Sequence, residues 1–164
     1  MAIGAHAVPL LSERGYAPTL VAAAAGSIGL MQVMGRLLFT PFHGRIPLPT
    51  LTALVFVVHA AALSTLLFVP GAVGVWVFAG LLGAGNGALT LARAGLIAEV
   101  YGATHYGSIN GNMALIIALV QAVAPLGAGM LRDASGSYTL MLWCLLAGSV
   151  LGALCVLQAR SHEQ

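Results

Sequence analysis

Long stretches without a charged side chain constrain this protein more than any other feature of its sequence. Residues 15–35, 46–92, 100–131 and 134–159 contain no Asp, Glu, Lys or Arg. A helix needs roughly 20 consecutive apolar residues to cross a hydrocarbon core ~30 Å thick. Each stretch is long enough for one crossing, and residues 46–92 are long enough for two. We therefore expect an integral membrane protein.

Composition excludes other classes of protein. Charged residues make up 6% of the chain and hydrophobic residues 60%, whereas soluble domains are ~25% charged. The net charge is +2, and Arg supplies all of the positive side-chain charge because the chain has no Lys. This is too little positive charge to bind the phosphates of a nucleic acid. No nucleic-acid partner is expected.

The spanning elements are predicted to be helices, because the apolar runs exceed ~20 residues and lack the alternation of a membrane barrel. Full spans are expected at Thr19–Thr40, Thr50–Val69, Ala72–Val100, Gly107–Leu131 and Tyr138–Ala159. A partial helix at Ala2–Leu11 precedes them; it is too short to span, and it lacks the basic start of a signal peptide. The predicted fold class is an all-α integral membrane protein, with five full transmembrane helices and a truncated first one in a single bundle over residues 1–164.

The placement of arginine predicts the orientation of the bundle, since successive connections face opposite sides of a membrane. Arg14 and Arg132 fall on one side, and the other side holds Arg36, Arg45, Arg160 and, nearby, Arg93. The side richer in Arg is normally cytoplasmic. We expect a multi-pass protein of the cell (plasma or inner) membrane, with the 41–49 and 101–106 connections and the C-terminus in the cytoplasm.

Small residues recur where helices can touch. Gly83 and Gly87 form a G-x-x-x-G pattern, and Gly148 and Gly152 form a second one. Such faces let helix backbones approach closely in lipid. The patterns predict tight packing within the bundle.

Arg93 is the strongest candidate for chemistry, because a charge inside a membrane span is costly and usually faces a partner or an aqueous cavity. Asn86, Thr90 and Arg93 are spaced i, i+4, i+7, so they share one face of a helix. One interpretation is that this face lines a cavity and contacts a polar or anionic solute. The other is that Arg93 reaches the cytoplasmic headgroups or pairs with Glu99.

A second polar pair lies on the next predicted helix. Asn110 and Gln121 are eleven residues apart, which is almost in phase on a helix. Their side chains either form hydrogen bonds between helices, typically worth ~0.6 kcal/mol each, or contact a solute. Gln32 has the same two interpretations.

Metal binding and catalysis have little support in the sequence. The five His residues have no ligand spacing with one another, with Cys or with carboxylates, so no metal and no cofactor are expected. No G-x-S-x-G or H-E-x-x-H motif occurs, so the protein is not expected to be an enzyme. His6 and His59 lie in spans and are the candidates for a proton relay within this chain.

Three segments carry a resemblance to a known family. The first is residues 6–15, HAVPLLSERG, which lead into a Gly/Ala-rich helix ending at Phe39. The second is residues 83–87, GAGNG, continuing through Arg93 to Gly102. The third is residues 106–111, YGSING, followed by residues 125–129 and 133–138. Together they resemble the C-terminal half of a major facilitator superfamily transporter, and within it the branch of oxalate/formate and monocarboxylate carriers.

The resemblance implies that the spans correspond to helices seven to twelve of that family, with helix seven incomplete. It also implies a cytoplasmic loop motif at Arg36 and Arg45. In the matching stretch Gly44 stands where the family has an Asp, so a gating salt bridge is not expected there. In the family, solute binds between two six-helix halves, of which this chain resembles one.

The favoured function is therefore secondary active transport of a small polar solute or organic anion by alternating access, as all or part of such a permease. The candidate substrate-binding residues are Arg93, Asn86, Thr90, Asn110 and Gln121. The alternative is a truncated, non-transporting membrane protein that needs a partner half or oligomerises, and a conductive oligomer is a third option. Expected partners are the solute, the lipid bilayer, and a missing N-terminal half or a second copy.

Overall fold

The computed structural model describes residues 2–42 and 44–161, and these residues form helices and short connections without a strand. The predictions for His43 and His162 lie outside the described residues. The elements are α1 (Ala2–Glu13), α2 (Pro18–Phe39), the short 3-10 helix η1 (Thr40–Phe42), α3 (Leu48–Phe68), α4 (Gly71–Ser135) and α5 (Thr139–Ser161). The all-helical prediction is confirmed for this part of the chain.

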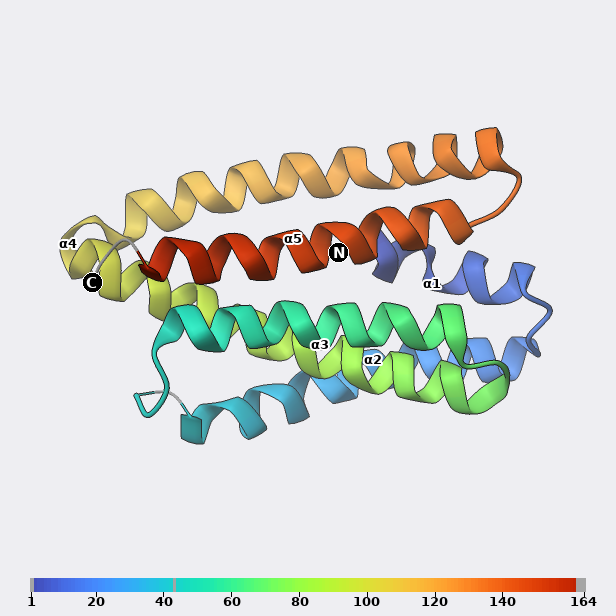
Figure 1. Ribbon diagram of the computed structural model, residues 1–164, viewed down its shortest axis with the longest axis horizontal. Helices are drawn as coiled ribbons and strands as arrows, with labels where there is room; N and C mark the ends of the chain where they lie inside the picture. Colours follow the sequence, from blue (N-terminus) through green and yellow to red (C-terminus); the bar gives the residue numbers. More distant parts are fainter. Residues whose placement is uncertain (1, 43, 162–164) are drawn as a thin grey trace.

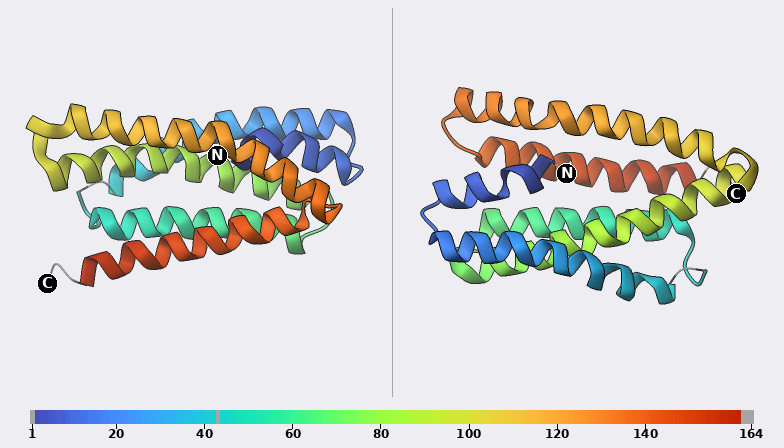
Figure 2. Two further views of the ribbon diagram at one scale, coloured as in Figure 1. Left: turned by 90° about the horizontal axis from the view of Figure 1, so that it is seen from above. Right: turned by 180° about the vertical axis from the view of Figure 1, so that it is seen from behind.

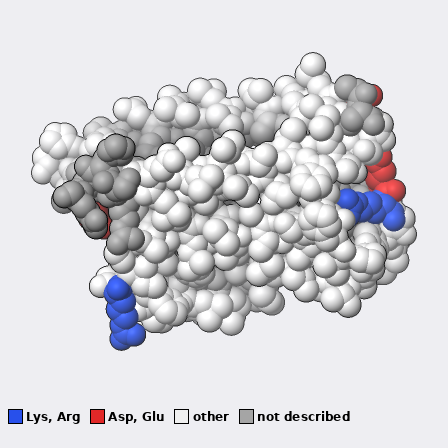
Figure 3. Space-filling view, in the orientation of Figure 1, with Lys and Arg blue, Asp and Glu red and all other residues white. Residues whose placement is uncertain are grey.

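Within the described residues, 5 helical segments are long and apolar enough to cross a membrane. They are Pro18–Phe42, Leu48–Phe68, Gly71–Glu99, Thr104–Asp133 and Thr139–Gln158. The predicted spans lie within these segments or overrun them by a few residues at their ends. Charged side chains on the face in Figure 3 lie at the two ends of the molecule, with an uncharged band between them.

The predicted break between the third and fourth spans is confirmed, because Gly71–Glu99 and Thr104–Asp133 are separate spanning segments. The connection between them is shorter than residues 101–106, and within α4 the backbone leaves helical angles at Gly102, where φ is 69° and ψ is 175°. Glycine adopts this combination without a clash because it has no Cβ. The kink divides α4 into a first arm, Gly71–Glu99, and a second arm, Thr104–Asp133, which diverge in Figure 1.

Pro125 lies inside the second arm, and its backbone remains helical. The second arm bends along its orange part in the left view of Figure 2. A proline bends a helix because its ring displaces the preceding turn and it has no N–H to donate. The arm therefore bends without leaving the helix.

Connections alternate between the two ends of the bundle, as Figure 1 shows. At one end Arg14 donates a hydrogen bond to the carbonyl of Leu66, and the Tyr16 hydroxyl accepts one from the Gly71 N–H at 3.2 Å. These bonds join the connection after α1 to the connection after α3. They satisfy backbone groups that the ends of helices otherwise leave unpaired.

The core lies between α2, α3 and the first arm of α4, and α5 packs on α3. The largest fully buried side chains include Phe78, Leu82 and Val75 of the first arm. The second arm contributes little to this core and is mostly exposed. The bundle is thus closely packed on one side and open on the other.

Glycines bring α2 and the first arm into backbone contact. A Cβ added to Gly87 would lie 2.0 Å from the carbonyl oxygen of Gln32, and one added to Gly35 would lie 2.2 Å from that of Ala84. A Cβ on Gly83 would also collide with α2, at the carbonyl of Ile28. The predicted packing role of the Gly83/Gly87 pair is therefore confirmed.

In the second glycine pair, Gly148 and Gly152, only Gly152 contacts a neighbouring helix. A Cβ on Gly152 would meet the ring of Phe56 at 2.9 Å, whereas one on Gly148 would meet nothing within 4 Å. Gly152 therefore seats α5 on α3, and Gly148 faces open space.

We predict that Gly87→Leu lowers the stability of the detergent-solubilised protein by ~2 kcal/mol or more, because a side chain cannot fit against the α2 backbone. Thermal unfolding would measure the loss. Gly26→Leu is the matched control, since a Cβ at Gly26 meets nothing within 4 Å. Equal losses in the two variants would contradict the packing role.

Candidate functional site

The five candidate residues divide between the two arms of α4. Asn86, Thr90 and Arg93 lie on the first arm, inside the packed part of the bundle, whereas Asn110 and Gln121 lie on the second arm. The two arms run in opposite directions (Figure 1), and no hydrogen bond joins the first group to the second within the described residues. The first-arm group is the candidate site.

Asn86 is buried and is joined to a histidine of α3. Its Oδ1 atom lies 3.1 Å from Nε2 of His59, and Nδ1 of the same ring lies 2.9 Å from the carbonyl oxygen of Val55. Asn86 is 8% exposed. This contact joins α3 to the first arm. In the core of a membrane no water is present to satisfy such polar groups, so they must pair with each other.

Both nitrogens of His59 face oxygen atoms, at Val55 and at Asn86. A neutral imidazole carries one N–H, so it can donate to only one of two oxygens. With a neutral ring, both contacts are hydrogen bonds when Nδ1 donates to Val55 and the Asn86 amide is turned so that its NH₂ donates to Nε2. The orientation of the amide is therefore linked to the tautomer of the ring.

Gly85 provides the space for this ring. A Cβ at Gly85 would lie 2.8 Å from Cε1 and 3.0 Å from Nδ1 of His59. The G-A-G-N-G segment thus does two things at once. Gly83 and Gly87 admit α2, while Gly85 on another face admits His59 next to Asn86.

Thr90 and Arg93 continue from this pair toward the kink. The Thr90 hydroxyl donates to the carbonyl of Gly87 at 2.7 Å, within its own helix, and the residue is exposed. Arg93 is half-buried, and among the described residues it forms no hydrogen bond and no ion pair. The predicted pairing with Glu99 is not observed in this part of the chain. The guanidinium is therefore available to a solute, a headgroup or water.

Asn110 and Gln121 are not enclosed by the bundle. Asn110 is half-buried and Gln121 is exposed, and neither forms a hydrogen bond with the described residues. The predicted hydrogen bonds between helices are therefore absent there. Their shared phase on the helix is confirmed, because α4 is helical from Thr104 onward.

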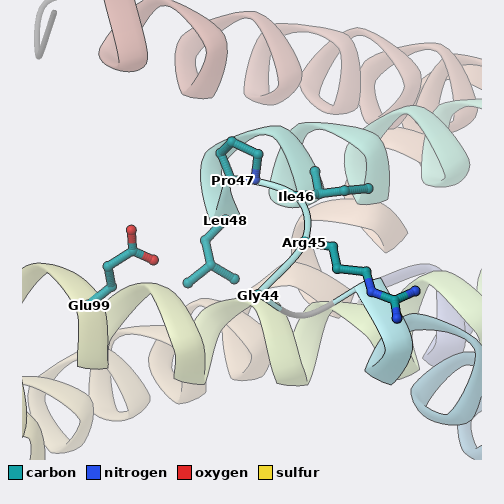
Figure 4. Close-up of a pocket in the computed structure, with 6 residues that line it drawn as sticks. All are labelled: Gly44, Arg45, Ile46, Pro47, Leu48 and Glu99. Carbon is teal, nitrogen blue, oxygen red and sulfur yellow. The ribbon is translucent and has the colours of Figure 1, made fainter.

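Arg36 and Arg45, the residues of the loop motif, lie at the end of the bundle opposite the connection between α3 and α4. Arg36 is exposed in the last turn of α2, and its carbonyl accepts a hydrogen bond from the Thr40 hydroxyl at 2.6 Å. Arg45 lines an open pocket of about 430 Å³ with Glu99 and the residues of the connection before α3. Figure 4 shows the Arg45 and Glu99 side chains pointing in different directions across this pocket. Within residues 2–42 and 44–161, Arg45 forms no ion pair with Glu99.

His6 joins α1 to the second arm. Its Nε2 donates to the carbonyl of Pro125 at 3.2 Å, and its ring lies 5.9 Å from that of Tyr138. Nδ1 is buried and has no partner among the described residues. In that part of the chain no group of three or more His, Cys, Asp or Glu side chains is placed to hold a metal ion.

Sequence reasoning named Asn86 and His59 separately and missed their contact. A usable signal was present, because each is a polar residue in a long apolar run and such residues tend to pair across helices. That signal could not show which polar residues of neighbouring spans contact each other.

No known protein family, no curated protein and no solved structure matches this chain.

We predict that Gly85→Ala lowers the thermal stability of the protein by ~1 kcal/mol or more, because the new methyl group meets the imidazole of His59. In a His59→Ala background the same substitution is expected to have little effect, since the obstructing ring is gone. Unfolding of the four proteins of this cycle in detergent measures the coupling. Additive effects would contradict the contact.

Proposed function

We propose that this protein is all or part of a secondary active transporter that moves a small organic anion or other polar solute across a cell membrane by alternating access. The observation that carries the proposal is Arg93. It is a half-buried guanidinium in a segment apolar enough to span a membrane, and no carboxylate of the described residues neutralises it.

The energetic argument starts from the cost of that charge. Arg costs ~2.5–3.5 kcal/mol at the centre of a membrane helix on insertion scales, and such residues usually face a partner or a water-filled path. Arg93 lies six residues from the end of the Gly71–Glu99 segment, so it bears part of this cost. An anionic solute supplies the missing counter-charge, and guanidinium binds carboxylates through paired hydrogen bonds. Arg93 would be the attracting residue, and Thr90, exposed one turn away, would offer a hydroxyl.

Proton coupling would use the His59–Asn86 pair. Asn86 lies on the same arm as Arg93, seven residues before it, and His59 contacts Asn86 from α3. A proton on His59 would add positive charge to this part of the bundle and so favour an anion. Exchange against a counter-solute is the other form of coupling.

The resemblance of three segments to the major facilitator superfamily supports membership of that family as part of this proposal. In such carriers discontinuous or kinked helices line a cavity near the middle of the membrane. The bend of the second arm is a feature of that kind.

The excess of arginine at one end supports an orientation in which Arg36, Arg45 and the end of α5 face the cytoplasm. The opposite end would carry Arg14 and Arg132, with Arg132 bound to Glu13 at 3.4 Å and to Asp133 at 3.2 Å. The plasma or inner membrane is the proposed location.

Transport is tested in liposomes containing the purified protein, by counterflow of a panel of radiolabelled small mono- and dicarboxylates. Arg93→Ala is expected to reduce uptake roughly tenfold or more, because hydrogen bonds to charged groups contribute ~1.5–3 kcal/mol. Arg93→Lys is expected to retain part of the activity, since Lys keeps the positive charge but lacks the planar set of N–H donors that binds a carboxylate through two hydrogen bonds.

Arg36→Ala is the matched control, because Arg36 is exposed at the end of α2 and has no ion pair within the described residues. Unchanged uptake by an Arg93→Ala protein that accumulates normally would remove Arg93 from the mechanism and favour its snorkelling to headgroups. Absence of uptake of every anion by the wild-type protein would favour the second candidate.

That second candidate is a non-transporting membrane protein that assembles with a partner. It is favoured by the second arm, where Gln121 and Asn110 lack partners among the described residues and Gln121 is exposed. In lipid, an exposed amide is unfavourable. A partner half, or another copy of the chain, would cover it.

Orientation is tested with a membrane-impermeant maleimide on intact cells, using a protein in which the free cysteines Cys144 and Cys155 are replaced by Ser. A cysteine at Ser12 is expected to be labelled from outside, and one at Arg45 only after the membrane is opened. The reverse pattern would overturn the proposed orientation.

A further inference from the structure

An open pocket lies at the end of the bundle where three connections meet. The connections after α1, after α3 and after α4 gather at this end in Figure 1. The pocket has a volume of about 350 Å³ and is lined by Arg14, by Tyr16 and by residues 66–70 at the end of α3. Arg93 lies toward the opposite end of the first arm. The pocket is therefore separate from the candidate solute site.

The guanidinium of Arg14 is held at this pocket but is not neutralised there. Its Nη1 atom donates a hydrogen bond to the carbonyl of Leu66. A guanidinium has five N–H groups, and the others have no acceptor among the described residues. No carboxylate of those residues forms an ion pair with Arg14. Arg14 therefore presents a positioned positive charge with N–H groups that can still donate.

Arg132, at the same end of the bundle, is paired in a different way. It binds Glu13 at 3.4 Å and Asp133 at 3.2 Å. Glu13, the carboxylate next to Arg14 in the sequence, therefore already has a cationic partner. Within the described part of the chain nothing supplies a counter-charge to Arg14, so an anion from outside the chain fits there.

An exposed aromatic surface leads from the pocket toward the apolar part of the bundle. Phe68 lines the pocket and is 66% exposed. Its ring meets the exposed ring of Trp143 edge to face, with the ring centroids 6.1 Å apart. Phe68 ends one spanning segment and Trp143 lies near the start of another, at the level where Trp is enriched in membrane proteins. These rings suit the acyl chain of a lipid whose headgroup occupies the pocket.

We propose that this pocket binds an anionic phospholipid, with the headgroup phosphate on Arg14 and an acyl chain along Phe68 and Trp143. Guanidinium binds phosphate oxygens through paired, charge-assisted hydrogen bonds. None of the described residues that line the pocket is an Asp or a Glu. The ammonium group of a zwitterionic headgroup would therefore find no counter-charge there, which favours an anionic headgroup. This proposal does not depend on transport.

The test uses the full chain in lipid vesicles with Trp143 as its fluorescent reporter. The chain has two Trp residues, and Trp76→Phe removes the other at a position that is 46% exposed. Phosphatidylglycerol or phosphatidylcholine with brominated acyl chains is added in increasing mole fraction, because bromine quenches a Trp that it contacts. The two quenching curves give the relative affinity of the two lipids for the surface around Trp143.

Phosphatidylglycerol is expected to be preferred about fivefold, the effect of one Arg near an anionic lipid surface. Arg14→Gln is expected to remove the preference, because it removes the charge while keeping an N–H donor for the carbonyl of Leu66. Arg36→Gln is the matched control and is expected to keep the preference. Arg36 is exposed at the opposite end of the bundle and has no ion pair within the described residues.

Val69→Glu replaces Arg14→Gln if that variant does not accumulate. Val69 lines the pocket and is 40% exposed, so a carboxylate there would neutralise Arg14 and is also expected to remove the preference. Val69→Gln, which adds no charge, is its control and is expected to keep the preference.

Equal quenching by the two lipids in the protein with Arg14 intact would overturn the proposal. A preference that persists in Arg14→Gln would also overturn it, because another group would then be responsible. Thermal unfolding in detergent with inorganic phosphate tests the other source of a phosphate group. Stabilisation by inorganic phosphate that requires Arg14, in a protein without a lipid preference, would assign the pocket to a free anion and overturn the assignment to a lipid.

Discussion

The close approach of α2 to the first arm of α4 is the contact on which the rest of the bundle depends. In lipid, helices gain little from hiding apolar surface, so association relies on van der Waals contact and a few polar bonds. Gly35, Gly83 and Gly87 remove the side chains that would hold the two backbones apart. Once these helices are in contact, α3 packs on the first arm and α5 on α3, and the buried polar pair of His59 and Asn86 is enclosed.

The polar groups of the spans differ in how they are satisfied, and this difference separates structural from functional roles. Thr90 and His59 bond to carbonyls of their own helices, and Asn86 bonds to His59. Arg93 and Gln121 have no such partner within the described residues. Under the proposed function, Arg93, on the first arm, would bind the solute. Gln121 lies on the exposed second arm, where a partner helix would cover it if the protein assembles with another.

Much of the fold could be predicted, because charge-free runs and Pro/Gly connections are local properties of the chain. The spans, the alternation of their ends and the packing role of Gly83 and Gly87 follow from such patterns. The length of the connection between the third and fourth spans could not be predicted in this way. The sequence predicts residues 101–106, whereas in the structure the positive φ of Gly102 reverses the chain and the next spanning segment begins at Thr104.

The candidate site was predicted only in part, for the same physical reason. Sequence alone determined that helices would cross an apolar layer, and that Asn86, Thr90 and Arg93 would share a face, because periodicity within one helix is local. Only the tertiary structure decided that Asn86 meets His59, that Arg93 stays unpaired among the described residues, and that Asn110 and Gln121 lie apart from them. Those outcomes depend on which helices touch and at what register, and contacts between helices are set by packing across the bundle, not by spacing along the chain.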